Sequence, residues 1–181
     1  LSAAAMALGD ASDREEMGLF VGVGREPPDE GDAETTLVLS ERDGQLDLDQ
    51  LAGTGRDAYP PLLPLKTLPN MILAHISIHL NVMGCNGVWA GGPEAGSEAL
   101  LSAYWAIREG RCKVALAGAA DSLIDLGQAR DLYRLGVHDP PGEGAVFLKL
   151  ESLDPNQKAP WTVEWTGEQG DVFSLSQHIG Y

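Results

Sequence analysis

The chain has 181 residues, of which 44% are hydrophobic and 22% charged, a composition typical of a globular domain with a substantial core. It contains 12 Lys and Arg residues and 27 Asp and Glu residues, which gives a formal net charge of −15. Nucleic acids and anionic membranes attract basic surfaces, so this balance argues against both as partners. No apolar run approaches the length of a membrane-spanning helix.

The N-terminal half alternates short apolar segments with polar and proline-rich connections. The expected elements are, in order, a helix at 2–9, a buried strand at 19–23, a short helix at 46–51, an extended segment at 59–64 and a helix at 68–82. The last of these carries Ile72, Ile76 and Leu80 on one stripe at helical spacing. The pattern at 35–40 is compatible with either strand or helix, and it is left undecided.

The C-terminal half repeats the alternation more clearly. We expect strands at 86–90, 114–117, 145–150 and 161–165, and helices at 94–109 and 123–135. In the helix at 94–109, small residues such as Ala99, Ala103 and Ala106 recur at helical spacing, which permits close packing against a neighbour. Strands alternating with helices predict an α/β fold with a mixed sheet and helices on both of its faces.

A turn between an expected strand and the helix at 94–109 has the layout that presents a nucleophile. Its sequence is Gly91-Gly92-Pro93-Glu94. A thiolate or oxyanion at the start of such a helix is favoured by the helix dipole, but proline has no ionisable group. Pro93 also suits the first helical position, where its missing N–H costs nothing. A carboxylate at this place is stabilised as the anion, so Glu94 would be a poor acid.

Other polar and aromatic residues allow both a functional and a structural interpretation. His75 and His79 have the i, i+4 spacing of a metal pair, but no third ligand is evident, so we expect packing roles and no metal. Cys85 and Cys112 are expected to be small buried side chains. Their spacing suggests no disulfide framework, which indicates a reducing, cytoplasmic compartment. Trp89 is expected in a core or an interface.

Six stretches, taken together and in this order, resemble the N-terminal domain of β-ketoacyl synthases, the thiolase-fold condensing enzymes of fatty-acid and polyketide synthesis. They are MGLFVGVG from Met17, the LPN helix from Leu68, GCN from Gly84, AGSEAL from Ala95, EGRCKVALAGAAD from Glu109 and GEGAVFLKLE from Gly142. The match is strongest over residues 17–151. The resemblance implies the N-terminal half of a thiolase-like layered fold, with the whole chain, 1–181, as one ketosynthase-like domain. Residues 152–181 would be a shortened remnant of the C-terminal half.

The chain departs from that family at its catalytic positions. Counted from Gly84, the nucleophilic cysteine of the family falls on Pro93. A stretch ending at Tyr181 is similar to the segment that carries the second catalytic histidine, and Tyr181 takes the place of that histidine. The loop with the first histidine has no counterpart. The resemblance therefore implies no catalytic residue and no cofactor in this chain.

These departures leave three functions open. The first is a partner subunit without condensing activity, similar to chain-length factors, which forms a homodimer or a heterodimer with a ketosynthase and also meets an acyl carrier protein. Pocket or interface residues would then be Asn86, Val88, Trp89, Gly92 and Glu94, because the strand before the nucleophile pairs across the dimer axis in this family. The second is a scaffold or binding protein that reuses the fold. The third is an active synthase with a misaligned nucleophile, for which Cys85 would have to serve.

Overall fold

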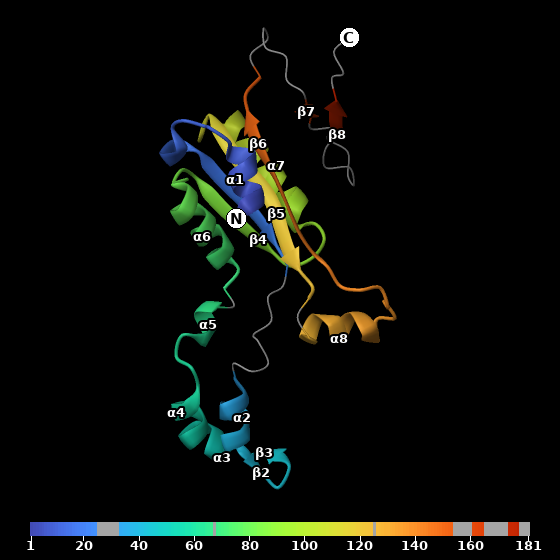
Figure 1. Ribbon diagram of the computed structural model, residues 1–181. Helices are drawn as coiled ribbons and strands as arrows, with labels where there is room; N and C mark the ends of the chain where they lie inside the picture. The colour runs from blue at the N-terminus through green and yellow to red at the C-terminus, as the bar shows by residue number, and fades with distance from the viewer. Residues whose placement is uncertain (25–32, 67, 125, 154–160, 165–173, 178–181) are drawn as a thin grey trace.

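The computed structural model describes residues 1–24, 33–66, 68–124, 126–153, 161–164 and 174–177 (Figure 1). Its centre is a four-stranded sheet in the order β4-β1-β5-β6. The strands are β1 Gly18–Val23, β4 Asn86–Ala90, β5 Val114–Ser122 and β6 Glu143–Glu151. The first three run parallel, and β6 runs antiparallel to β5. The expected mixed sheet is confirmed.

Helices cover both faces of this sheet, as the alternation of elements predicts. Helices α1 Ser2–Leu8 and α6 Asn70–Leu80 pack on one face, and α7 Ala95–Arg108 packs on the other. Because successive side chains of a strand point to opposite faces, β1 serves both layers. Its Leu19, Val21 and Val23 face α1 and α6, whereas Phe20 faces α7.

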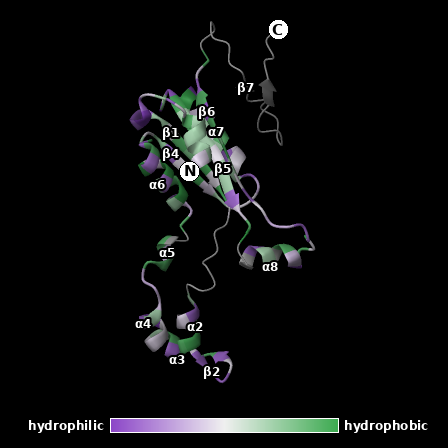
Figure 2. Cartoon of the chain, in the orientation of Figure 1, coloured by the Kyte–Doolittle hydropathy of each residue, from purple (hydrophilic) through white to green (hydrophobic). Residues whose placement is uncertain are grey.

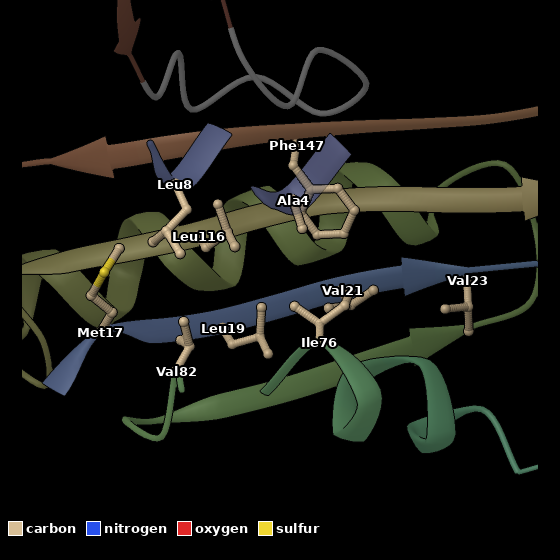
Figure 3. Close-up of a cluster of buried hydrophobic side chains, with 10 residues drawn as sticks. All are labelled: Ala4, Leu8, Met17, Leu19, Val21, Val23, Ile76, Val82, Leu116 and Phe147. Atoms are coloured by element: carbon tan, nitrogen blue, oxygen red, sulfur yellow. The ribbon is translucent and has the colours of Figure 1, made fainter. Parts of the chain in front are cut away.

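The larger core lies between the sheet and the helices α1 and α6. Figure 3 shows its ten buried side chains: Ala4, Leu8, Met17, Leu19, Val21, Val23, Ile76, Val82, Leu116 and Phe147. All six residues of β1 are buried, as expected for a central strand. Figure 2 shows hydrophobic residues concentrated on the strands and on the helices beside them.

Helix α7 approaches the sheet through small residues. Ala99, Ala103 and Ala106 are fully buried against Phe20 and the alanines of β5. At Gly22 of β1, a Cβ atom would lie only 2.5 Å from the Ala95 carbonyl. The absence of a side chain there lets the first turn of α7 sit directly on β1 and fixes where that helix begins.

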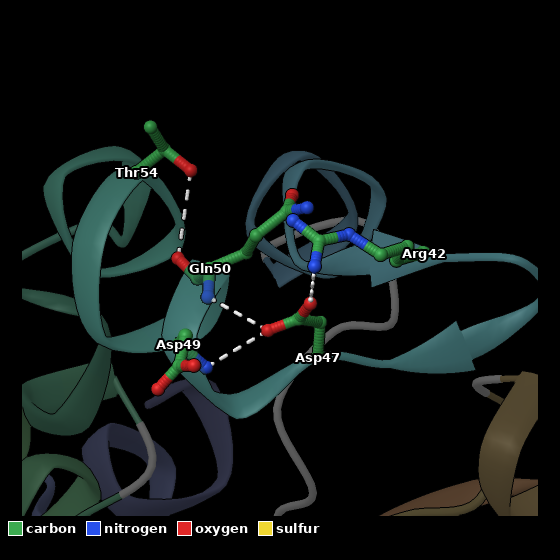
Figure 4. Close-up of polar contacts among 5 residues, drawn as sticks. All are labelled: Arg42, Asp47, Asp49, Gln50 and Thr54. Atoms are coloured by element: carbon green, nitrogen blue, oxygen red, sulfur yellow. Dashed lines mark hydrogen bonds and ion pairs between the residues drawn. The ribbon is translucent and has the colours of Figure 1, made fainter.

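A small lobe between β1 and α6 lies apart from the sheet (Figure 1). It contains α2 Glu34–Leu39, β2 Glu41–Arg42, β3 Gln45–Leu46, α3 Leu48–Gln50, a π-helical turn Leu51–Gly55, α4 Arg56–Ala58 and α5 Leu63–Lys66. Asp47 organises its polar side (Figure 4). One carboxylate oxygen accepts hydrogen bonds from the backbone N–H of Asp49 (2.9 Å) and Gln50 (3.1 Å), which caps α3, and the other pairs with Arg42 at 2.9 Å.

The lobe corrects two expectations and settles a third. The undecided segment at 35–40 is helical, as α2. The helix expected at 46–51 is shorter, because Leu46 pairs in a β-hairpin and the π-helical turn begins at Leu51. The segment at 59–64 was expected to be extended, but α5 begins at Leu63. Pro64 lies in its first turn, where a backbone N–H has no helical acceptor and a proline is tolerated.

Outside the lobe the differences lie at element ends. Strands β5 and β6 are longer than predicted, and the helix expected at 123–135 begins at Leu126, as α8 Leu126–Arg134. The strand expected at 161–165 is β7 Trp161–Glu164, which pairs antiparallel with β8 Ser174–Gln177. Tyr181 and most of the proposed remnant at 152–181 lie outside the described residues.

Candidate functional site

The turn that carries Pro93 joins the end of β4 to the start of α7. Gly91 has φ of 117°, a conformation that favours glycine, and its N–H donates to the Val23 carbonyl at 3.2 Å. The Ala95 N–H then donates to the Gly92 carbonyl at 3.2 Å, which closes a four-residue turn. Glu94, with φ −79° and ψ −13°, fits the third position of a type I turn. Pro93 occupies the second position, where proline is favoured.

This geometry corrects the expected helix start. The helix begins at Ala95, so Pro93 lies in the preceding turn and not at the first helical position. Glu94 is the residue that flanks the helix, and its carbonyl accepts a hydrogen bond from the Ser97 hydroxyl at 2.8 Å. Its carboxylate folds back, with Oε2 lying 2.7 Å from the point where a Cβ on Gly92 would be. Gly92, Pro93 and Glu94 are all exposed.

The turn lies at the carboxyl edge of the parallel strands, among exposed carboxylates. Asp121, near the end of β5, lies against Gly24, which follows β1. Glu143, at the start of β6, pairs in register with Ser122, and its carboxylate accepts a hydrogen bond from the Ser122 hydroxyl at 3.4 Å. Together with Glu94, these groups make this edge of the sheet acidic.

The remaining predicted site residues lie along β4, an edge strand. Trp89 packs with the cluster under α7, and its ring centroid lies 6.2 Å from that of Phe20. Val88 packs on the opposite face against the core beside α6, so both side chains are half-buried. Asn86 is exposed, and its side chain donates to the Gly84 carbonyl at 3.2 Å.

The backbone N–H and C=O groups of β4 point alternately toward β1 and toward the open edge of the sheet. At one end the Leu19 N–H donates to the Cys85 carbonyl, and at the other the Gly91 N–H donates to the Val23 carbonyl. In a parallel pair this places the odd-numbered residues of β4 toward β1. The backbone N–H groups of Asn86, Val88 and Ala90 therefore face away from β1, on the side where the described residues provide no neighbouring strand.

A pocket of about 550 Å³ lies at the opposite, amino edge of the strands. Its lining includes Met17, Gly84, Cys112 and Val114, which all precede or begin strands, and none of the predicted site residues. This pocket therefore lies apart from Pro93, and the pocket or interface role of the residues around Pro93 stays a prediction.

Both cysteines lie at this amino edge and not beside the turn. Cys85 directly precedes β4, whereas Pro93 follows it. The five residues of β4, together with Gly91 and Gly92, lie between them, and the strand alone spans on the order of 16 Å at the usual rise per residue. Cys112 is buried, as expected, and Cys85 is half-buried. Burial and a hydrogen bond with the Cys85 thiol raise the pKa of Cys112 to about 11. Sequence patterns do not predict that the two thiols meet, because their contact depends on strand register.

His75 and His79 lie exposed on α6, with ring centroids 6.1 Å apart. Nδ1 of His79 is 2.9 Å from the His75 carbonyl oxygen, a contact that ties the ring to its own helix. Within the described ranges, no three His, Cys, Asp or Glu side chains are grouped so that they could hold a metal ion. Nor does this part of the chain contain a helix long and apolar enough to cross a membrane.

The family model described as the N-terminal domain of beta-ketoacyl synthase matches residues 1–150. The chain therefore belongs to the β-ketoacyl synthase family through that domain. A comparison with curated proteins finds no match.

Among the solved structures similar to this chain, the first named below shows the same fold. One is described as "AntDE:AntF (apo): type II PKS acyl-carrier protein in complex with its ketosynthase bound to the hexaketide"; it shares 19% identity at a TM-score of 0.58, over 78% of this chain and 40% of that one. Another, "The ishigamide ketosynthase/chain length factor", shares 21% identity at a TM-score of 0.48, over 85% and 41%. The chain thus spans about 40% of the length of these solved chains. The thiolase-like ketosynthase fold expected from the sequence is confirmed.

Proposed function

We propose that this chain is a ketosynthase-like subunit without condensing activity that pairs with a ketosynthase. The observation that carries the proposal is Pro93. By its spacing from Gly84 it falls at the position expected for the family's nucleophile. It lies in an exposed turn that a proline stabilises and that offers no thiol, hydroxyl or amine to an acyl group.

The two thiols of the chain support the same conclusion. A nucleophile must lie within hydrogen-bond reach of its base and beside the oxyanion donors. Cys85 and Cys112 lie at the amino edge of the strands, at the far end of β4 from the turn. The alternative in which Cys85 replaces the missing nucleophile therefore requires a different active site from that of the family.

The proposed pairing surface is the open edge of β4 together with α7. Three outward backbone N–H groups of β4 lack a strand partner within the part of the chain that is described. Val88 and Trp89 are only half-buried by α6 and α7, so a second subunit could complete their burial. Strand-to-strand addition at such an edge satisfies the backbone and buries these side chains at once.

The charge of the chain supports docking of the acyl carrier protein on the partner subunit. Acyl carrier proteins are acidic in this family, and the carboxyl edge here carries Glu94, Asp121 and Glu143. Like charges repel and slow association, so the carrier is expected to dock on the ketosynthase and not on this chain.

Co-purification with a ketosynthase from the same gene cluster tests this surface. Ala90→Pro removes one outward N–H of β4 and leaves its bonds to β1 intact, whereas Ala90→Ser keeps the N–H. We expect Ala90→Pro to weaken the complex by at least about tenfold and Ala90→Ser to leave it unchanged. Equal binding by both variants, with unchanged circular dichroism, would rule out pairing through β4. Formation of a homodimer by the chain alone would make the partner a second copy.

A further inference from the structure

The only two cysteines of the chain lie on either side of β1, at the same edge of the sheet. Cys85 directly precedes β4 and lies level with Gly18, since Leu19 pairs with Asn86 and donates its N–H to the Cys85 carbonyl at 2.9 Å. Cys112 precedes β5, whose Ala115 pairs with Gly18 from the other side.

Gly18 makes the meeting of the two thiols possible. A Cβ atom at Gly18 would lie 2.9 Å from the sulfur of Cys112, so that sulfur occupies the space above the glycine. Directly before the neighbouring strand, Cys85 lies level with Gly18, and its interaction with Cys112 contributes to the raised pKa of the Cys112 thiol. Both side chains pack in the same cluster, beside Phe20 and Ala115.

The pair is within reach of small solutes. Cys112 lines the pocket of about 550 Å³, together with Arg111, Lys113 and Gly84, the residue before Cys85. Cys85 itself is half-buried, so this residue is not sealed from solvent in the folded chain.

We propose that Cys85 and Cys112 are a modification site, at which a hydroperoxide converts the two thiols to a reversible intramolecular disulfide. The Cys85 thiolate attacks one peroxide oxygen, the O–O bond breaks, and a sulfenic acid forms on Cys85 while the other oxygen leaves as water or an alcohol. The Cys112 sulfur then attacks the Cys85 sulfur. The S–S bond forms, and the hydroxyl leaves as water with the Cys112 proton. Two electrons pass from the thiols to the peroxide.

The surroundings set the order of these steps. Burial and its hydrogen bond to Cys85 raise the pKa of Cys112 to about 11, so Cys112 remains a thiol at neutral pH. Since the thiolate is the nucleophile, the more exposed Cys85 reacts first and Cys112 resolves. Disulfides in a reducing compartment are usually transient and act as redox sensors. A bond that links the starts of β4 and β5 across β1 fits such a role.

The test is treatment of the folded chain with hydrogen peroxide, followed by intact mass measurement in denaturant without reductant. We expect a loss of two hydrogen atoms, the disappearance of both free thiols, a cross-linked peptide containing Cys85 and Cys112, and full reversal by dithiothreitol. Oxidation in urea should form the bond at least about tenfold more slowly, because the native register holds the sulfurs together.

Single variants separate the two roles. Cys112→Ala should accumulate a sulfenic acid on Cys85 that dimedone captures, and Cys85→Ala should leave Cys112 largely unreacted. Addition of oxygen atoms to the wild-type chain without a cross-linked peptide would overturn the proposal. So would a disulfide between two molecules, or two thiols that survive peroxide. None of these outcomes depends on the pairing with a ketosynthase.

Discussion

At the scale of single residues, Pro93 is a structural residue of its turn. Counting residues from Gly84 predicts that it falls at the position of the family's nucleophile, and that assignment stays a prediction. Its exact role was missed: it holds the second position of a type I turn, and α7 begins two residues later, at Ala95. Helix boundaries depend on the last hydrogen bond formed, which residue patterns specify only within a residue or two.

Replacing Pro93 by alanine should therefore destabilise the fold slightly. The proline restricts the unfolded chain at a position whose native conformation it already fits. We expect Pro93→Ala to lower the free energy of unfolding by about 0.4–1 kcal/mol in urea denaturation. A gain in stability would show that the proline is strained and is kept for another reason.

Cys112 should make stability depend on pH in the alkaline range. Its pKa is raised in the fold to about 11, above the ordinary value of about 8.5 for an unfolded cysteine. The unfolded chain therefore loses this proton first, so the contribution is complete below roughly pH 8.5 and is lost as the pH rises toward 11. Unfolding measured from pH 8 to 11 should show a shallower decline for Cys112→Ala than for the wild-type chain, and identical slopes would contradict the assignment.

At the scale of elements, the predictions were most accurate for segments in which apolar residues recur regularly over many positions. The helices α6 and α7 and the strands β1 and β4 lie close to their predicted ranges, because each buries a regular set of side chains. The lobe was harder, since its segments are short and bury few side chains. The meeting of Cys85 and Cys112 could not be predicted, because it needs the register of three strands.

The packing of α7 on β1 can be tested with a matched pair of glycines. Gly22→Ala places a methyl group 2.5 Å from the Ala95 carbonyl, and the expected cost is about 1–3 kcal/mol of unfolding free energy. Gly53→Ala, in the π-helical turn of the lobe, meets no atom within 4 Å and should be neutral or stabilising by up to about 1 kcal/mol. Equal effects would mean that α7 does not rest on β1 as described.

At the scale of the whole molecule, the chain keeps the scaffold of its family, and we propose that it lacks the chemistry. The family model matches residues 1–150, which contain nearly the whole central sheet, while Pro93 stands at the expected position of the nucleophile. The net charge of −15 supports the proposal that an acidic carrier docks on the partner subunit. The proposal that the partner carries the chemistry rests on this charge, on the retained packing and on Pro93.

Covalent acyl capture tests that assignment most directly. The chain would be incubated with acyl thioesters, and separately with cerulenin, and its intact mass compared with that of Cys85→Ala and of an active ketosynthase. We predict no acyl adduct on the chain, whereas the ketosynthase becomes acylated. An acyl adduct on the wild-type chain that is absent from Cys85→Ala would contradict the account and make Cys85 a nucleophile.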